Sequence, residues 1–168
     1  MRVRRDCRVG LAYKVCDECG ELVEEVGRDR PRFYIHGYEQ ILPALEHKLS
    51  GLHVGEKFCV TLKPGEAFGR YEERLCQRVP RWRFPSDVSL VVGARLELGI
   101  DDHGLGIDYG TVLFCIKEVG ADEVVVDGNH PLAGRELTYR GEIVEVRVAS
   151  YRELEAMGPQ TLPHGLRL

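Results

Sequence analysis

The residue pattern with the clearest potential for chemistry is the pair Cys16 and Cys19, which stand two residues apart in the sequence CDEC. Two thiols at this spacing in a turn can supply half of a tetrahedral zinc site, form a disulfide, or remain ordinary exposed thiols. A tetrahedral site needs two further ligands, and no second pair occurs at ligand spacing. The possible third ligands are His36, His47 and His53. The sequence leaves all three alternatives open and predicts no required cofactor.

Nucleophilic and phosphate-transfer chemistry are not indicated elsewhere in the chain. The sequence contains no GxSxG motif, no HExxH motif and no glycine-rich phosphate loop. Its 6 histidines are scattered, and each taken alone is more typical of a structural or exposed position. Any catalytic site must therefore be sought in the way the elements gather other side chains.

Length and composition describe a globular protein of 168 residues, enough for one ordinary domain or two small ones. Hydrophobic residues make up 43%, which is typical of a chain with a real core. The net charge of −4 disfavours nucleic acid as a partner. No apolar run is long enough to span a membrane, and no secretory signal follows the basic opening MRVRR. We expect a cytoplasmic protein.

The first part of the chain predicts strands around one helix. Strands are indicated by alternating or extended segments at residues 7–15, 21–26, 30–37 and 53–64. A helix is predicted within residues 38–52, with Pro43 near its start and Gly51 at its end, because apolar residues recur at helical spacing at Ile41, Leu42, Leu45 and Leu49. The segment 136–148 predicts another strand, whose alternation shifts near Ile143 and Val144, as at a bulge or where both faces are buried. The fold class is therefore α+β, an antiparallel sheet wrapped on one helix.

The middle of the chain has a pattern of its own. Alternating segments at residues 95–100, 110–119 and 123–127 predict a small sheet, and turn-rich sequence stands at both of its ends. Insertions are tolerated at exposed loops whose ends lie close together, so this segment reads as an inserted domain. The segment YRELEAM, residues 151–157, predicts a short helix near the end of the chain.

Several segments together resemble the SlyD-like FKBP family of peptidyl-prolyl isomerases. They are YIHGYEQILPALEHKLSGLHVGEKFCV, GEAFGRYEERLCQRVP and VVVDGNHPLAGRELTY, and the resemblance covers residues 1–150 in one register. It implies an FKBP-type half-barrel at residues 1–69 and 129–151, interrupted by a mostly-β insert-in-flap domain at 70–128. Residues 152–168 are then a C-terminal tail.

The resemblance implies an enzyme that isomerises X–Pro bonds of unfolded or partly folded proteins, with an insert that holds such clients as a chaperone. Isomerisation needs no nucleophile, because the barrier of about 18–20 kcal/mol comes from amide resonance that is lost as the bond twists. A water-poor apolar cleft can favour the twisted amide over the planar one. We therefore expect the site to be lined by aromatic and aliphatic side chains. We also expect unfolded or nascent polypeptides as partners and a monomeric protein.

The resemblance also assigns the residues of the isomerase site, although each of them taken alone is typical of an ordinary core or strand residue. Two positions depart from the family pattern: Glu24 stands where the family usually has Asp, and Phe68 where it usually has Tyr. The backbone N–H near Leu42 would meet a substrate carbonyl. The expected site residues are Tyr13, Val23, Glu24, Ile41, Leu42, Leu45, Phe68 and Tyr139.

In the insert, apolar residues on the sheet and in the loop VPRWRFP are the expected client-binding surface, with Trp82 and Phe84 as anchors. They are equally typical of the core of a small domain, which buries a limited fraction of its surface. The expected client-binding residues are Val79, Trp82, Phe84, Leu96 and Leu98.

Two alternatives remain open for the function. The chain could be a chaperone on an FKBP scaffold whose isomerase activity is weak or lost through Phe68 and Glu24. It could also be a metal-binding protein, because relatives often carry a tail rich in His and Cys that binds nickel and zinc. The corresponding part of this sequence offers only His164, which disfavours nickel delivery.

Overall fold

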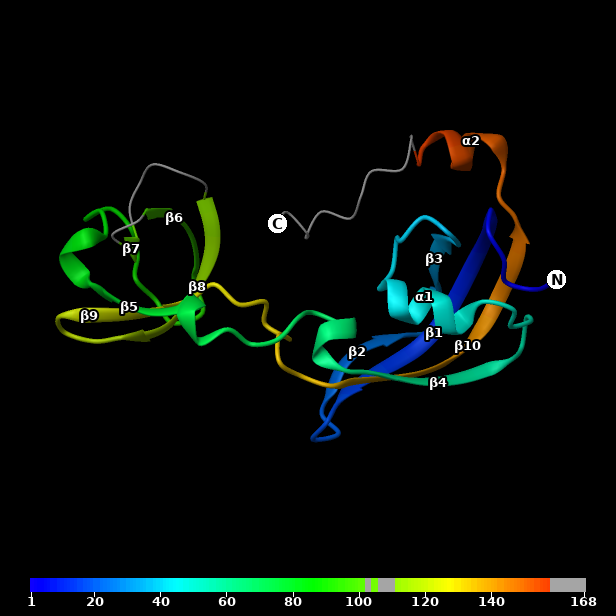
Figure 1. The fold of residues 1–168 in the computed structure, drawn as a ribbon, viewed down its shortest axis with the longest axis horizontal. Helices are drawn as coiled ribbons and strands as arrows, with labels where there is room; N and C mark the ends of the chain where they lie inside the picture. The colour runs from blue at the N-terminus through cyan, green and yellow to red at the C-terminus, as the bar shows by residue number, and fades with distance from the viewer. Residues whose placement is uncertain (102–103, 106–110, 158–168) are drawn as a thin grey trace. The chain divides into compact units, whose positions relative to one another are not determined.

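The chain folds into two units, one of them formed by both ends of the chain. The computed structural model describes residues 1–101, 104–105 and 111–157 (Figure 1). One unit contains residues Met1–Gly69 and continues from Gly134, and the other contains Arg70–Ala133. The first junction coincides with the expected one, and the second follows Ala133, whereas the sequence analysis placed it after residue 128.

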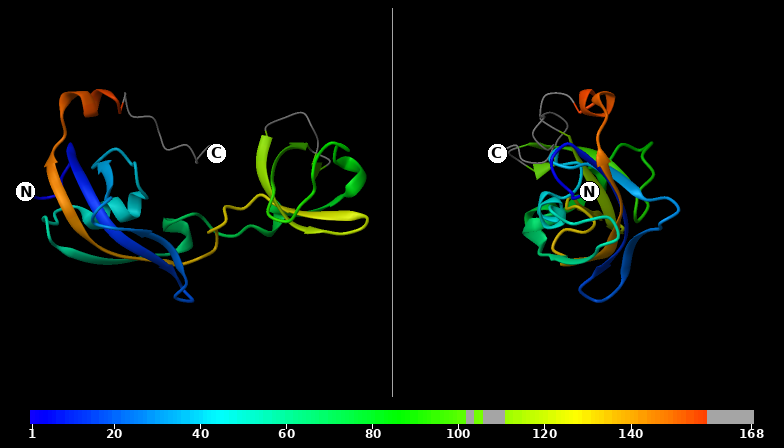
Figure 2. Two further views of the ribbon diagram at one scale, coloured as in Figure 1. Left: turned by 180° about the vertical axis from the view of Figure 1, so that it is seen from behind. Right: turned by 90° about the vertical axis from the view of Figure 1, so that its right-hand side faces the viewer.

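The first unit is an antiparallel sheet in the order β2-β1-β10-β4. Strand β3 shares an edge of β1 with β2: β3 lies opposite Arg8–Leu11, and β2 lies opposite Tyr13–Cys16. Figure 2 shows the long strands β1 and β10 curving around the helix α1. The strands are β1 (Cys7–Asp17), β2 (Leu22–Val26), β3 (Arg32–Ile35), β4 (Lys57–Leu62) and β10 (Leu137–Val148).

The helix α1 (Pro43–Leu49) is shorter than predicted. Leu42 precedes a proline, which disfavours helical dihedrals, and it adopts φ −51° and ψ 125°. Leu42 is therefore the N-cap, and residues 38–42 form turns and bends instead of the first helical turn. Leu45 and Leu49 are buried, and Gly51 follows the end of the helix with φ +85°.

The predicted irregularity in the last long strand is confirmed. The register between β1 and β10 shifts between Gly10 and Leu11, which pair with Glu145 and Ile143. Val144 is the extra residue of this bulge. A side chain at Gly10 would come within 2.9 Å of the Phe33 ring, so the close approach of β3 requires glycine at this position.

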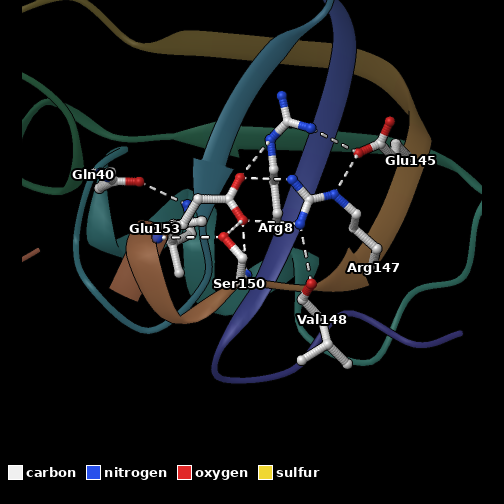
Figure 3. Close-up of polar contacts among 8 residues, drawn as sticks. Arg8, Gln40, Glu145, Arg147, Val148, Ser150 and Glu153 are labelled. Atoms are coloured by element: carbon white, nitrogen blue, oxygen red, sulfur yellow. Dashed lines mark hydrogen bonds and ion pairs between the residues drawn. The ribbon is translucent and has the colours of Figure 1, made fainter. Parts of the chain in front are cut away.

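The predicted short helix after β10 is confirmed as α2 (Tyr151–Glu155). Its N-cap Ser150 and Glu153 form a capping box. Glu153 also accepts two hydrogen bonds from Arg147, at 2.9 and 2.6 Å, and lies 3.5 Å from Arg8 Nε (Figure 3). Glu145 contacts both arginines, which closes a ring of four alternating charges. The bonds from Arg147 and Ser150 lower the pKa of Glu153 to about 2.

The second unit is a sheet in the order β5-β9-β8-β6-β7, and it confirms the three predicted strands of the middle segment. Its core consists of Val79, Phe84, Phe114, Ile116, Val124 and Val126. The strands are β5 (Cys76–Pro80), β6 (Arg95–Asp101), β7 (Gly104–Leu105), β8 (Thr111–Val119) and β9 (Glu123–Asp127).

Short 3₁₀ helices lie in the connections at η1 (Pro64–Glu66), η2 (Glu73–Leu75) and η3 (Arg81–Arg83). Among the described residues, none of the helices has the length and apolar character needed to cross a membrane.

Candidate functional site

Three of the expected isomerase residues meet on the face of the sheet that curves around α1. Tyr13 on β1 donates a hydrogen bond from its hydroxyl to Glu24 Oε2 on β2 at 3.0 Å. The Tyr13 and Tyr139 rings lie 5.8 Å apart between centroids, with an interplanar angle of 45°. Val15 pairs with Glu24 on one side and with Tyr139 on the other, so the sheet register itself brings these side chains together.

A bulge in β2 explains why Val23 and Glu24 can both belong to this site. Val15 pairs with Glu24, but the next residue of β1, Cys16, pairs with Leu22, so Val23 is an extra residue in the ladder. A bulge interrupts strict alternation and redirects a side chain. Val23 is half-buried there, while Glu24 is exposed.

The two phenols of the site remain protonated at physiological pH. Burial, and then the Glu24 carboxylate, raise the pKa of Tyr13 to about 12. The same two causes raise the pKa of Tyr139. Arg32, which the sequence analysis missed, lies 3.6 Å from Glu24 Oε1 through Nη1. The continuation of β3 along the β2 edge of β1 brings it there. The cluster is therefore not suited to transferring protons.

The helix contributes an apolar floor on the same side of the sheet. Leu45 is buried, and Ile41 and Leu42 are half-buried in the segment that precedes α1. That segment is fixed by polar contacts: Glu46 Oε1 accepts the Gly37 amide at 2.7 Å, and Gln40 Oε1 accepts the Ile35 amide at 2.6 Å.

Behind the segment lies a buried polar cluster that sequence reasoning also missed. The Tyr34 hydroxyl lies 3.1 Å from His36 Nδ1, and Glu46 is buried beside them. Burial raises the pKa of Tyr34 and lowers the pKa of His36, while the Glu46 carboxylate raises both. The sign of this cluster in the sequence is the charged residue Glu46, which stands directly after an apolar position of the helix. These groups hold the loop to the helix.

Phe68 lies in the connection that follows β4. It is half-buried and comes directly after the turn around η1. The Gly69 amide donates to the Pro64 carbonyl at 2.8 Å, so the chain folds back on itself there. The structure thus places Phe68 at the end of the first unit's first segment.

An open hollow of about 1050 Å³ lies on the other face of the same sheet. Strand alternation turns Lys14, Thr138 and Arg140 to that face, away from α1. Salt bridges join Lys14 to Glu25 at 2.9 Å and Arg28 to Glu142 at 2.7 Å. The lining of the hollow also includes Tyr13 and Phe58 beside these charged side chains.

The pair Cys16 and Cys19 lies at the turn between β1 and β2, with Cys16 half-buried and Cys19 exposed. Asp17 shapes the turn, because its Oδ1 accepts the amides of Cys19 at 3.0 Å and Glu21 at 2.8 Å. Among residues 1–101, 104–105 and 111–157, no three His, Cys, Asp or Glu side chains are grouped to hold a metal. The possible third ligands lie elsewhere: His36 contacts Tyr34, and His53 contacts Glu56.

In the insert, the structure separates the expected client-binding residues. Val79 and Phe84 are in the core, which corrects their assignment to a surface. Leu96 is half-buried against that core, and the side chain of Leu98 lies outside the described part of the structure. Trp82 is 78% exposed. Val79 and Phe84 are buried because a domain this small needs most of its apolar residues for a core.

The exposed apolar surface of the insert includes residues that sequence reasoning did not assign. Val91, Val92 and Leu113 are 57%, 61% and 50% exposed. The sequence gives one sign that Val91 and Val92 are exposed. They are adjacent valines directly before a glycine turn, and they do not belong to an alternating strand pattern. Trp82 belongs to η3, which is anchored because the Arg81 amide donates to the Asp122 carbonyl at 2.8 Å.

Comparison with known proteins gives a consistent set of relatives, although no family model matches the chain. The chain is 41% identical to the FKBP-type peptidyl-prolyl cis-trans isomerase SlyD of Pasteurella multocida over 154 residues, which are 92% of this chain and 74% of the relative. It is 38% identical to the SlyD protein of Vibrio cholerae, covering 92% and 73% of the two chains. The SlyD protein of Escherichia coli is 41% identical, with 92% and 75% covered.

Proposed function

The chain belongs to the SlyD family of FKBP-type peptidyl-prolyl cis-trans isomerases, and we propose that X–Pro bonds rotate in the site formed by Tyr13, Glu24, Leu45 and Tyr139. The observation that carries this proposal is the hydrogen bond of 3.0 Å between Tyr13 and Glu24. The Tyr13 ring also packs against the Tyr139 ring on the face of the sheet toward α1. We include Val23, Ile41, Leu42 and Phe68 in the same site by family resemblance.

The chemistry follows from the nature of the barrier. The planar amide is stabilised by resonance and carries a large dipole, and the twisted amide at the transition state has lost both. An apolar site with little water favours the twisted form relative to water, where the planar dipole is well solvated. Tyr13, Leu45 and Tyr139 are each at most 7% exposed, which supports this role.

Orientation of the substrate requires donors as well as an apolar wall. Leu42 is the N-cap of α1, and its backbone is not helical. We propose that its N–H donates a hydrogen bond to a substrate carbonyl. Tyr13 and Glu24 hold one another and fix the polar edge of the site. Because the surface beside the proline is apolar, bonds with an apolar residue before proline are the preferred substrates.

A working site is favoured over a decayed one by the position of the Glu24 carboxylate. Glu24 is one methylene longer than the usual Asp, yet it still reaches the Tyr13 hydroxyl at 3.0 Å. Phe68 keeps the aromatic ring of the usual Tyr and loses its hydroxyl donor. We therefore propose an active isomerase whose rate is lowered, not abolished, by these two differences.

The test is the cis-to-trans relaxation rate of a short peptide with an apolar residue before proline, measured with and without the protein. Clear acceleration supports the site, and Glu24→Asp with Phe68→Tyr should raise it only a few fold. A rise from near zero to a high rate would instead show that the natural site has decayed and that the chain is mainly a chaperone.

The insert is the proposed holding surface for unfolded clients. Trp82, Val91, Val92 and Leu113 leave apolar area on the surface of a unit whose core has few residues. Apolar side chains exposed in this way are available to bind apolar segments of an extended chain. Loss of client-aggregation suppression after Trp82→Ala together with Leu113→Ser would support this role, and full retention would contradict it.

The proposed setting is the cytoplasm, with nascent or unfolded polypeptides as partners and a monomeric enzyme. All 6 cysteines are free, as in a reducing compartment. The net charge of −4 supports protein clients over nucleic acid, and no membrane partner is proposed. Zinc or nickel at Cys16 and Cys19 stays a prediction, tested by metal content before and after alkylation of the two thiols.

A further inference from the structure

The connectors are the two segments at the ends of the insert, residues 70–75 and 128–133, and the Asn129 side chain bonds one to the other. The ladder between β5 and β9 ends at the pair Cys76 and Asp127. Beyond it, the Gly128 amide donates to the Leu75 carbonyl at 2.9 Å. Further along, Asn129 Oδ1 accepts the Glu72 amide at 2.9 Å, and Asn129 Nδ2 donates to the Glu72 carbonyl at 3.0 Å. The carboxamide thus replaces a rung of the ladder.

Asn129 is itself held by a buried carboxylate. Asp127 Oδ1 accepts the Asn129 amide at 2.9 Å and the second hydrogen of Asn129 Nδ2 at 2.7 Å. Asp127 Oδ2 accepts the Tyr71 hydroxyl at 3.3 Å and lies 3.7 Å from Lys117 Nζ. Asp127 is only 4% exposed, so its position is fixed. Every donor and acceptor group of the Asn129 carboxamide is therefore used.

The two connectors are short outside this clasp, which we define as Tyr71, Glu72, Asp127 and Asn129. On the first unit's side, the Gly134 amide donates to the Gly69 carbonyl at 2.8 Å. Residues 130–133 form a local turn, because His130 accepts the amides of Leu132 and Ala133. On the first connector, only residues 70–71 lie between the two sets of bonds. These are the Gly134–Gly69 bond on one side and the Asn129–Glu72 bonds on the other.

We propose that Asn129 is a positioning residue that couples client capture to isomerisation, by keeping the connectors short and paired. This proposal rests on the proposed division of function between the insert and the first unit. A client bound to the insert reaches the isomerase site at an effective concentration that depends on connector length and stiffness. Without the Asn129 side chain, Glu72 loses both of its backbone bonds to the second connector, and the next backbone bond between the connectors is the one from Gly128 to Leu75.

The expected effect of Asn129→Ala is on turnover of a protein client. Loss of this pairing loosens the connectors and lowers the effective concentration of a bound client at the isomerase site, so kcat should fall by roughly two- to fourfold. KM for the protein client should not change, because the client surface of the insert is intact. The rate with a short proline peptide should also be unchanged, because the peptide does not need the insert.

The matched control is Glu72→Ala. Asn129 contacts only the backbone of Glu72, so removal of the Glu72 side chain leaves the clasp in place. Tyr71→Phe is the second variant, because it removes the bond to Asp127 and keeps the ring. It should lower kcat for the protein client by less than Asn129→Ala does, and Glu72→Ala should not lower it.

The experiment measures kcat and KM of the full chain for the proline-limited refolding of a reduced, carboxymethylated protein, and the rate for a short peptide. A fall in kcat confined to the protein client in Asn129→Ala supports the proposal. An unchanged kcat in Asn129→Ala and Tyr71→Phe, or equal falls for protein and peptide, would overturn it. If the natural chain shows no preference for the protein over the peptide, the proposed role of the insert fails instead.

Discussion

The two units use the same kind of structure, a small antiparallel sheet, for opposite treatments of apolar surface. The first unit curves its sheet around α1 and encloses Tyr13, Leu45 and Tyr139. The insert has a core of a few residues and leaves Trp82 and Leu113 exposed. Enclosure removes water, as amide rotation requires, while exposure makes apolar area available to an extended chain. The first unit differs from the insert in having a helix, α1, that covers one face of its sheet.

The largest expected effect comes from emptying the core of the insert. Phe114 is fully buried there, and Phe114→Ala should destabilise the insert by about 3–5 kcal/mol. Thermal unfolding should then show an early transition for the insert. If the two units are as separate as their cores indicate, the later transition should remain. A single transition at a lower temperature would show that the units unfold together.

The second effect concerns the client surface. An exposed tryptophan at the centre of a binding surface is typically worth about 2 kcal/mol, so Trp82→Ala should weaken client affinity about 30-fold. Fluorescence anisotropy with a labelled unfolded protein measures this change. Tyr151→Ala is the matched control, since Tyr151 is 75% exposed on the first unit. Equal weakening by both variants would contradict a client surface on the insert.

A smaller effect is expected inside the isomerase site. Tyr13→Phe removes the hydrogen bond to Glu24 and keeps the ring, so it should lower peptide isomerisation about fivefold, which corresponds to about 1 kcal/mol. Peptide relaxation kinetics give the factor. Tyr38→Phe serves as the control, because Tyr38 also donates to a carboxylate, Asp6, but outside the proposed site. The same loss in both variants would indicate a general structural effect.

The smallest effect is a local response of α2 to acid. Glu153 has a folded pKa of about 2, below its usual 4.5, because of its bonds with Arg147 and Ser150. Its contribution to the stability of α2 is therefore complete above pH 4.5 and is lost as the pH falls toward 2. NMR shifts of Tyr151 should follow this change, and high salt should weaken the contribution. The Glu153→Gln variant should lack the transition; a transition that persists would assign it to another group.

Much of the fold could be predicted from the sequence, because alternation and turn residues dominate it. The bulge near Val144 and the strands of the insert were evident from local pattern. The predicted start of α1 was wrong, because Pro43 imposes an extended conformation on Leu42. The spacing of apolar residues does not reveal this effect. Burial was harder, since apolar residues such as Phe84 and Trp82 look alike in sequence and only the fold decides which one is covered.

The candidate site was predictable mainly through the family resemblance. The contact of Tyr13 with Glu24 depends on the register between β1 and β2, which is set by a bulge that local pattern did not indicate. Arg32, Glu46 and Asn129 were missed for a similar reason. Their roles arise from hydrogen bonds and ion pairs between segments distant in sequence, which no periodicity encodes.

The central claim is that the first unit carries out the rotation and the insert captures the client. The most direct test compares kcat/KM for a short proline peptide with kcat/KM for an unfolded protein, in Tyr13→Phe and in Trp82→Ala. The account predicts that Tyr13→Phe lowers both values by the same factor, and that Trp82→Ala lowers the value for the protein alone. Equal losses for both substrates in Trp82→Ala would contradict the division of labour between the two units.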